Sequence, residues 1–217
     1  IKIFRNFYSR RNYLELFYNQ EGIMNILALN NLSYGVFVLG TNDEEKLNAC
    51  IINTSIQVTI NPVQIIVTSI NENKTCEMLK KSKTFALSVL DKTCTFETIK
   101  HFGYQSGRKI DKFANFPYSL DLNGNPYLKS QVCSVISGKI ASSIDLGTHT
   151  LFIADVQEAI LTSNNPPLTY ADYQNEIKPK QTVNTEKKII GWRCKICGFE
   201  IMEKNLSKDY ICPICGH

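Results

Sequence analysis

The stretch from Gln131 to Ile160 reads QVCSVISGKIASSIDLGTHTLFIADVQEAI, and it carries the strongest fold signal in the chain. Two long runs rich in β-branched residues, 131–143 and 148–160, flank the short turn Asp145-Leu146-Gly147. β-branched residues favour strands, and a short turn between two strands makes an antiparallel pair. The sequence therefore predicts a long β-hairpin here.

Shorter segments upstream have the same character. Strand patterns occur at 34–40, 57–60, 64–70 and 85–90. Helical periodicity is confined to 24–32, 74–83 and 95–102. Pro62 ends the strand before it, because proline cannot donate to a strand ladder. Many strands, few helices and hairpin-like connections predict a mainly β fold, an antiparallel barrel with helical excursions.

Composition narrows the class of protein. The 217 residues suit one medium domain with a small appendage. The net charge of +4 is spread out rather than gathered in one block, so no nucleic-acid partner is expected. No apolar run reaches the length of about 18 residues that a membrane helix needs, so no membrane association is expected.

The chain divides into four expected parts. Residues 1–23 form an N-terminal extension or leader, because a cleaner sequence begins at Met24. Residues 24–175 form the barrel. The stretch 163–188 has the Pro-, Asn- and Lys-rich composition of a linker, and we place the linker itself at 176–188. Residues 189–217 form a small metal-binding domain.

Two Cys-x-x-Cys pairs define that small domain: Cys194 with Cys197, and Cys212 with Cys215. Four thiolates at this spacing can surround one metal ion tetrahedrally. A glycine follows each pair, as expected where the turn needs a positive φ and aims backbone N–H groups at the sulfurs. Spacing alone is compatible with zinc, the commoner structural metal, and with iron.

The other four cysteines lie in apolar contexts, and we interpret them as buried, reduced thiols: Cys50, Cys76, Cys94 and Cys133. Free thiols together with a thiolate-metal site favour a reducing cytoplasm. A nucleophilic set of Cys133, Asp145 and His149 is disfavoured, because Cys133 lies in a strand pattern and thiol catalysis needs an exposed thiolate.

A polar block interrupts the apolar strands at Asn53-Thr54-Ser55 and Gln57. Hydroxyls and amides in an otherwise buried strand suit the polar edge of a bound ring, or a phosphate. The alternative is an ordinary half-exposed strand. Neither a dinucleotide-binding glycine motif nor a phosphate-binding loop occurs.

Four motifs, in this order, decide between these interpretations. They are Tyr34-Gly35-Val36-Phe37-Val38, the run from Asn53 to Thr59, the run from His101 to Phe113 and the run from Gly147 to Ile153. They resemble the flavin reductase-like family with the FMN-binding split barrel, most closely its flavoredoxin branch. The resemblance covers about residues 24–175 and implies a split β-barrel.

The same resemblance implies that FMN binds at a homodimer interface. The implied FMN contacts are Asn53, Thr54, Ser55, Gln57, Asn71, Thr75, Phe102, Ser106, Gly107, Lys112 and Phe113. The cation of Lys112 and the backbone N–H groups near Gly107 would suit the phosphate. His149 is the implied catalytic residue, near the flavin or the nicotinamide, and a purely structural strand histidine is the open alternative.

The tail resembles a rubredoxin module, and the whole chain is similar to the high-molecular-weight rubredoxins. This resemblance shifts the expected metal from zinc to iron. It implies that NADH or NADPH reduces FMN, that FMN reduces the iron, and that a flavodiiron oxygen or nitric oxide reductase is the acceptor. No residue pattern distinguishes NADH from NADPH.

Two other functions stay open at this point. One is a flavin-binding electron carrier without nicotinamide activity. The other is a non-redox interaction protein with a structural zinc ribbon.

Overall fold

The computed structural model describes residues 4–7, 18–19, 22–23, 26–43, 46–179, 191–194, 196–201, 206–207 and 209–216. The chain separates into two compact units. The larger is Tyr34–Lys178, which is close to the barrel expected at 24–175. The smaller combines Ile1–Ser33 with Pro179–His217. Most of the linker expected at 176–188 lies outside the described residues.

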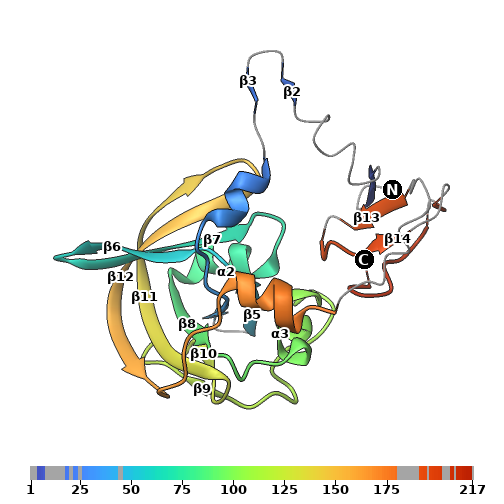
Figure 1. Cartoon of the computed structure of the whole chain (residues 1–217). Coiled ribbons are helices and arrows are strands. Elements are labelled where there is room, and N and C mark those ends of the chain that lie inside the picture. The colour runs from blue at the N-terminus through green and yellow to red at the C-terminus, as the bar shows by residue number, and fades with distance from the viewer. Residues whose placement is uncertain are drawn as a thin grey trace. The chain divides into compact units, whose positions relative to one another are not determined.

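The larger unit is built on a seven-stranded antiparallel sheet in the order β5-β4-β8-β11-β12-β7-β6 (Figure 1). The strands are β4 (Phe37–Asn42), β5 (Leu47–Ile52), β6 (Ser55–Ile60), β7 (Val63–Ile70), β8 (Thr84–Leu90), β11 (Val132–Asp145) and β12 (His149–Leu161). The two ends of the sheet, β5 and β6, are joined by only Asn53-Thr54. The sheet must therefore curl back on itself, as a split barrel does.

The long hairpin predicted from 131–160 is confirmed. β11 and β12 pair from Ser134↔Leu161 to Asp145↔Thr150. The register shifts between Ser137 and Gly138 and again between Ile140 and Ser142. Such bulges bend the strand and increase its twist, which helps a sheet to close.

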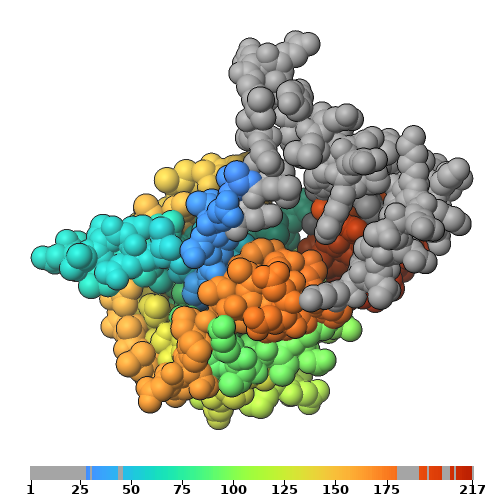
Figure 2. Space-filling model, viewed as in Figure 1, coloured from blue at the N-terminus to red at the C-terminus, as the bar shows by residue number. Residues whose placement is uncertain are grey.

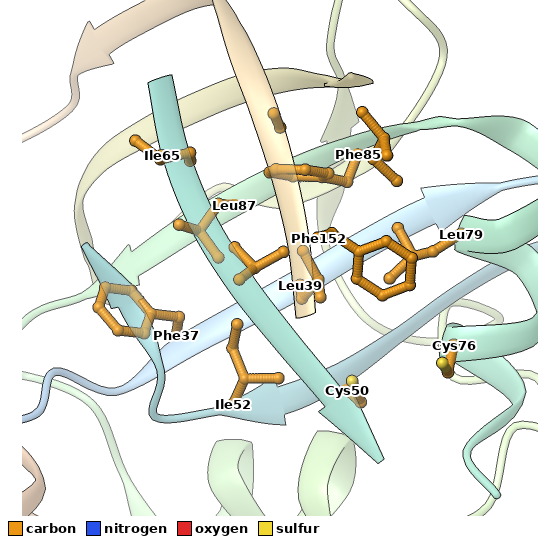
Figure 3. Close-up of a cluster of buried hydrophobic side chains, with 13 residues drawn as sticks. Phe37, Leu39, Cys50, Ile52, Ile65, Cys76, Leu79, Phe85, Leu87 and Phe152 are labelled. Atoms are coloured by element: carbon orange, nitrogen blue, oxygen red, sulfur yellow. The ribbon is translucent and has the colours of Figure 1, made fainter. Parts of the chain in front are cut away.

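Buried side chains lie on both faces of the sheet. One cluster fills the barrel and includes Phe37, Leu39 and Phe152 (Figure 3). The second includes Val36 and Val38 and packs with the helical segments on the other face. Alternating residues of this stretch thus enter different clusters, because successive side chains of a strand point to opposite faces.

The main helices begin at side-chain caps. α2 (Lys74–Ser82) is capped by Asn73, and α3 (Phe96–Gly103) is capped by Thr95. Each cap oxygen accepts a hydrogen bond from a backbone N–H of the first turn. Gly103 is the last residue of α3, and Tyr104 is the C-cap. A short hairpin follows, formed by β9 (Tyr118–Leu120) and β10 (Pro126–Leu128).

The segment after β12 is more ordered than its linker-like composition predicted. α4 (Tyr170–Asp172) begins with a capping box between Thr169 and Asp172 and continues into η2 (Tyr173–Ile177). The buried carboxylate of Asp91 accepts hydrogen bonds from Ser163 Oγ and Asn165 Nδ2. Asp91 is distant in sequence from the residues that it holds, so the local composition of the segment could not reveal this contact.

The smaller unit contains a three-stranded sheet in the order β1-β13-β14. Its strands are β1 (Phe4–Phe7), β13 (Gly191–Cys194) and β14 (Glu200–Ile201). β1 pairs with β13 in the register Phe4↔Cys194 to Phe7↔Gly191. Four residues of the expected N-terminal extension therefore share a sheet with the metal-binding segment.

The same unit includes β2 (Tyr18–Asn19), β3 (Gly22–Ile23) and the short helix η1 (Ile26–Asn31). None of the helices in the part of the chain described above is long and apolar enough to cross a membrane.

Candidate functional site

The four tail cysteines form a compact thiol cluster. Their Sγ atoms all lie within 4.8 Å of one another. The distance is 3.6 Å between Cys194 and Cys215, and 3.5 Å between Cys197 and Cys212. A tetrahedral centre with metal–sulfur bonds of about 2.3 Å has sulfur–sulfur distances of about 3.8 Å. The donor set and its spacing therefore fit one metal ion.

The two Cys-x-x-Cys pairs adopt matching turns. Gly198 N–H donates to the Cys194 carbonyl at 2.9 Å, and Gly216 N–H donates to the Cys212 carbonyl at 2.8 Å. The φ angles are 75° at Gly198 and 71° at Gly216. An added Cβ would meet nothing within 4 Å at either position, so glycine is present for its backbone conformation. The positive φ expected from the sequence is confirmed.

Burial and crowding act on the thiols of this cluster. Burial raises the pKa of Cys194 to about 11, and backbone N–H groups of Cys197 and Ile196 oppose that rise. A hydrogen bond with Cys215, followed by burial, raises the pKa of Cys197. Metal binding at this cluster would release protons, because thiolates and not thiols are the metal ligands.

The polar block of the barrel lies at the junction of the two edge strands. Asn53, Thr54 and Ser55 are half-buried. The Thr54 hydroxyl donates to Asn53 Oδ1 at 3.1 Å, and the Thr54 carbonyl accepts a hydrogen bond from Thr68 N–H. Ser55 and Gln57 line a cavity of ≈ 250 Å³ that is otherwise mostly apolar. The structure thus places four of the implied FMN contacts together on one edge of the barrel.

Asn71 and His149 both lie at the β11–β12 turn. Asn71 Nδ2 donates to Asp145 Oδ1 at 3.1 Å and to the Gly147 carbonyl at 2.9 Å. His149 pairs with Ile70 across the ladder, and its Nδ1 lies 2.9 Å from Thr148 Oγ1. The Asn71 side chain therefore orders the turn that presents His149.

Thr75 and Gly107 are brought together by Asn48, which sequence analysis missed. Asn48 Nδ2 donates to Thr75 Oγ1 at 3.0 Å. A Cβ added to Gly107 would lie 2.1 Å from Asn48 Oδ1, so the backbone of Gly107 packs directly on this amide. The available signal was a buried polar residue, Asn48, inside the otherwise apolar β5.

Cationic side chains surround the same place, beside the N-terminus of α2. Lys46 Nζ donates to the Gly107 carbonyl at 3.3 Å. Arg108 Nη1 and Lys74 Nζ each lie 2.9 Å from a carboxylate oxygen of Glu77. The hydrogen bonds from Lys74 and Arg108 lower the pKa of Glu77. Together with Ser106, these groups surround a helix N-terminus, where an anion is stabilised.

The remaining implied contacts, Phe102, Lys112 and Phe113, lie in the interior. The rings of Phe102 and Phe113 are 5.4 Å apart, and both belong to the second core cluster. Lys112 is only 2% exposed. Its Nζ donates to the carbonyls of Ala49 and Phe102 at 2.7 and 2.8 Å. The ammonium group that was expected to face a phosphate thus already serves two backbone carbonyls.

Comparison with known proteins agrees with this geometry. A flavin reductase-like domain model matches residues 29–177, and the chain belongs to that family. The barrel and the thiol cluster together define an oxidoreductase of flavin-linked electron transfer.

Among curated proteins, the High molecular weight rubredoxin of Moorella thermoacetica is 30% identical over 221 residues, 89% of this chain and 96% of that protein. The Ferric-chelate reductase (NAD(P)H) of Archaeoglobus fulgidus is 33% identical over 150 residues, 69% of this chain and 89% of that protein.

Solved structures show the same fold. The FMN-binding protein from Thermus thermophilus with bound 1-cyclohex-2-enone superposes with a TM-score of 0.60 at 17% identity, over 88% of this chain and 97% of that one. An NADH:FAD oxidoreductase from Streptomyces globisporus gives 0.60 at 19% identity, over 65% of this chain and 84% of that one.

Proposed function

We propose that the protein takes electrons from NADH or NADPH into FMN and passes them to an iron ion held by Cys194, Cys197, Cys212 and Cys215. The observation that carries this proposal is that one chain joins a flavin reductase-like barrel to a four-thiolate cluster. A bound flavin would accept a hydride as two electrons and release them singly. An iron ion can accept single electrons from the flavin by changing its oxidation state, whereas zinc cannot.

The phosphate of FMN fits best beside the N-terminus of α2. Thr75, Ser106 and Gly107 lie there with the cations of Lys46 and Arg108. The ribityl chain and ring edge would contact the hydroxyls and amides of Asn53, Thr54, Ser55 and Gln57, with Asn71 at the adjoining turn. Phe102 and Phe113 would support this site from the core.

His149 is our candidate for the residue beside the reacting ring. It lies next to Asn71 on the half-exposed start of β12, where an incoming nicotinamide could approach. The reductase of Archaeoglobus, whose name includes NAD(P)H, supports nicotinamide as the donor.

We also propose a homodimer built on the β6–β7 hairpin, which projects from the barrel in cyan in Figure 2. β6 is an edge strand, and its register against β7 shifts between Gln57 and Thr59. Its three apolar side chains, Ile56, Val58 and Ile60, are 58%, 45% and 83% exposed. Exposed apolar residues on an open edge strand are costly in a monomer and are typical of an interface.

The acceptor of the electrons would be another redox protein, for which a flavodiiron oxygen or nitric oxide reductase is our candidate. A reducing cytoplasm is the compartment that suits the chain. All eight cysteines, each within the described residues, are free of disulfides, and seven of them are buried.

The absorption spectrum of protein expressed with iron available tests the proposal. We expect flavin bands and ferric-thiolate bands, both bleached by NADH or NADPH under argon. A flavin that is bleached only by a protein donor would indicate an electron carrier instead. A colourless protein with zinc in the tail would overturn the redox function.

A further inference from the structure

Lys112 is a basic residue in the interior of the barrel unit. Its side chain is among the largest that are fully buried. Burial disfavours the charged form and lowers the pKa of Lys112 to about 8. Its Nζ meets two acceptors, the carbonyls of Ala49 and Phe102, at 2.7 and 2.8 Å.

Both acceptors are carbonyls at places where the sheet or the helix provides no N–H donor. Ala49 is in β5, the outermost strand at one end of the sheet order, so one of its two edges has no neighbouring strand within that sheet. Phe102 is in the last turn of α3, where backbone carbonyls have no further helical N–H to accept from. Lys112 therefore joins a strand edge to a helix end.

The same residue closes the base of a loop. We define the 104–113 segment as the residues from Tyr104 to Phe113. His101 Nε2 donates to the Lys112 carbonyl at 2.7 Å, while Lys112 Nζ donates to the Phe102 carbonyl. Two hydrogen bonds thus hold the residues before and near the end of the segment together.

The middle of the 104–113 segment reaches the proposed phosphate site. Gly107 packs on Asn48, whose amide holds Thr75. Arg108 pairs with Glu77 of α2 at 2.9 Å. Any change at the base of the segment would be passed to these contacts, because Gly107 has no space in which to shift toward Asn48.

We infer that Lys112 is a positioning residue: its amino group clamps the base of the 104–113 segment and thereby sets the phosphate end of the flavin site, without touching the phosphate itself. This inference rests on the FMN site proposed above. It assigns to Lys112 a different role from the phosphate contact that the family resemblance implied.

The variant Lys112→Met tests the clamp, because it keeps an unbranched side chain only one atom shorter and removes the amino group that donates to both carbonyls. Lys100→Met is the matched control, since Lys100 is an exposed lysine on the same helix as Phe102. Hydrogen exchange resolved by peptide, on flavin-free protein, should show faster exchange in the 104–113 segment of Lys112→Met alone. Equal exchange in Lys112→Met and wild type would overturn the inference.

Riboflavin, which has no phosphate, separates positioning from general destabilisation. For Lys112→Met we expect FMN affinity to fall about tenfold or more while riboflavin affinity stays within about twofold of wild type. Equal losses for both flavins would mean that Lys112 only stabilises the barrel. Wild-type protein that binds neither flavin would refute the proposed function, while the exchange experiment would still report on the clamp.

Lys112→Gln provides a second variant in case the methionine variant does not fold. Its amide can still donate to one carbonyl, so we expect a smaller rise in exchange and a smaller loss of FMN affinity. If both variants lose the folded barrel, Lys112 is a determinant of the whole fold and the positioning role is wrong.

Discussion

The backbone of Gly107 lies against the side chain of Asn48 so closely that a single added methyl group would come within 2.1 Å of the amide oxygen. Asn48 is 1% exposed and also donates to Thr75, so it has little freedom to move aside. This contact joins the 104–113 segment to β5 and to the start of α2.

Gly107→Ala should therefore damage the proposed phosphate site. We expect a loss of about 1–3 kcal/mol in the free energy of unfolding, as for overpacked interiors, together with weaker FMN binding. Urea titration and flavin fluorescence measure the two effects. In the double variant Gly107→Ala/Asn48→Ala the clash is relieved, so its losses should be smaller than the sum of the single losses. Additive losses would show that the two residues do not interact.

Cys212→Ser should abolish the metal centre while leaving the flavin site intact, because the cluster and the barrel belong to different compact units. Ferric-thiolate absorption should disappear, and nicotinamide should still reduce the FMN. Cys133→Ser is the control, since Cys133 lies in the barrel core and outside the cluster. Loss of flavin binding in Cys212→Ser would contradict the two-module interpretation.

The depressed pKa of Lys112 predicts a specific pH dependence of stability. The folded protein releases this proton near pH 8, whereas the unfolded chain keeps it up to the ordinary value of 10.5. Between these values the unfolded state binds more protons, so the free energy of unfolding rises with pH.

The contribution should approach about 3 kcal/mol across that window, at about 1.4 kcal/mol per pH unit. The measurement is urea unfolding of wild type and of Lys112→Met at several pH values, because other groups titrate equally in both. Parallel pH profiles would contradict a lowered pKa at Lys112.

Ile60→Lys should convert the proposed dimer into a monomer, because it places a charge at the most exposed of the apolar side chains on β6. Sedimentation velocity measures the assembly, and flavin content measures its consequence for the site. Leu122→Lys is the control, at an apolar residue that is 57% exposed but lies in the β9–β10 hairpin. A wild-type protein that is monomeric with full flavin occupancy would refute this interface.

Short-range patterns were a sound guide to the secondary structure. The strand at β4, the helices α2 and α3 and the long β11–β12 hairpin follow from patterns of neighbouring residues, and all were predicted. The ordered segment at 163–177 was not predicted, because its stability depends on Asp91 and on packing against distant parts of the chain. Composition reports only local preference.

The candidate site divides in the same way. The four cysteines and their glycines were recognisable from spacing, because each knuckle is a local turn closed by its own hydrogen bond. The link from Thr75 through Asn48 to Gly107 joins residues that are 27 and 59 positions from Asn48, and no local pattern records it.

Residue types and their order were enough to establish a mainly β barrel, a four-thiolate metal cluster and a flavin-linked family. These properties depend on periodicity, spacing and side-chain chemistry, all of which can be read directly from the sequence. The tertiary structure alone decided that Lys112 donates to two backbone carbonyls, and that Phe4–Phe7 pairs with the strand of Cys194. Both depend on which hydrogen-bonding groups are left without a partner once distant segments have packed, and that is a property of the folded chain.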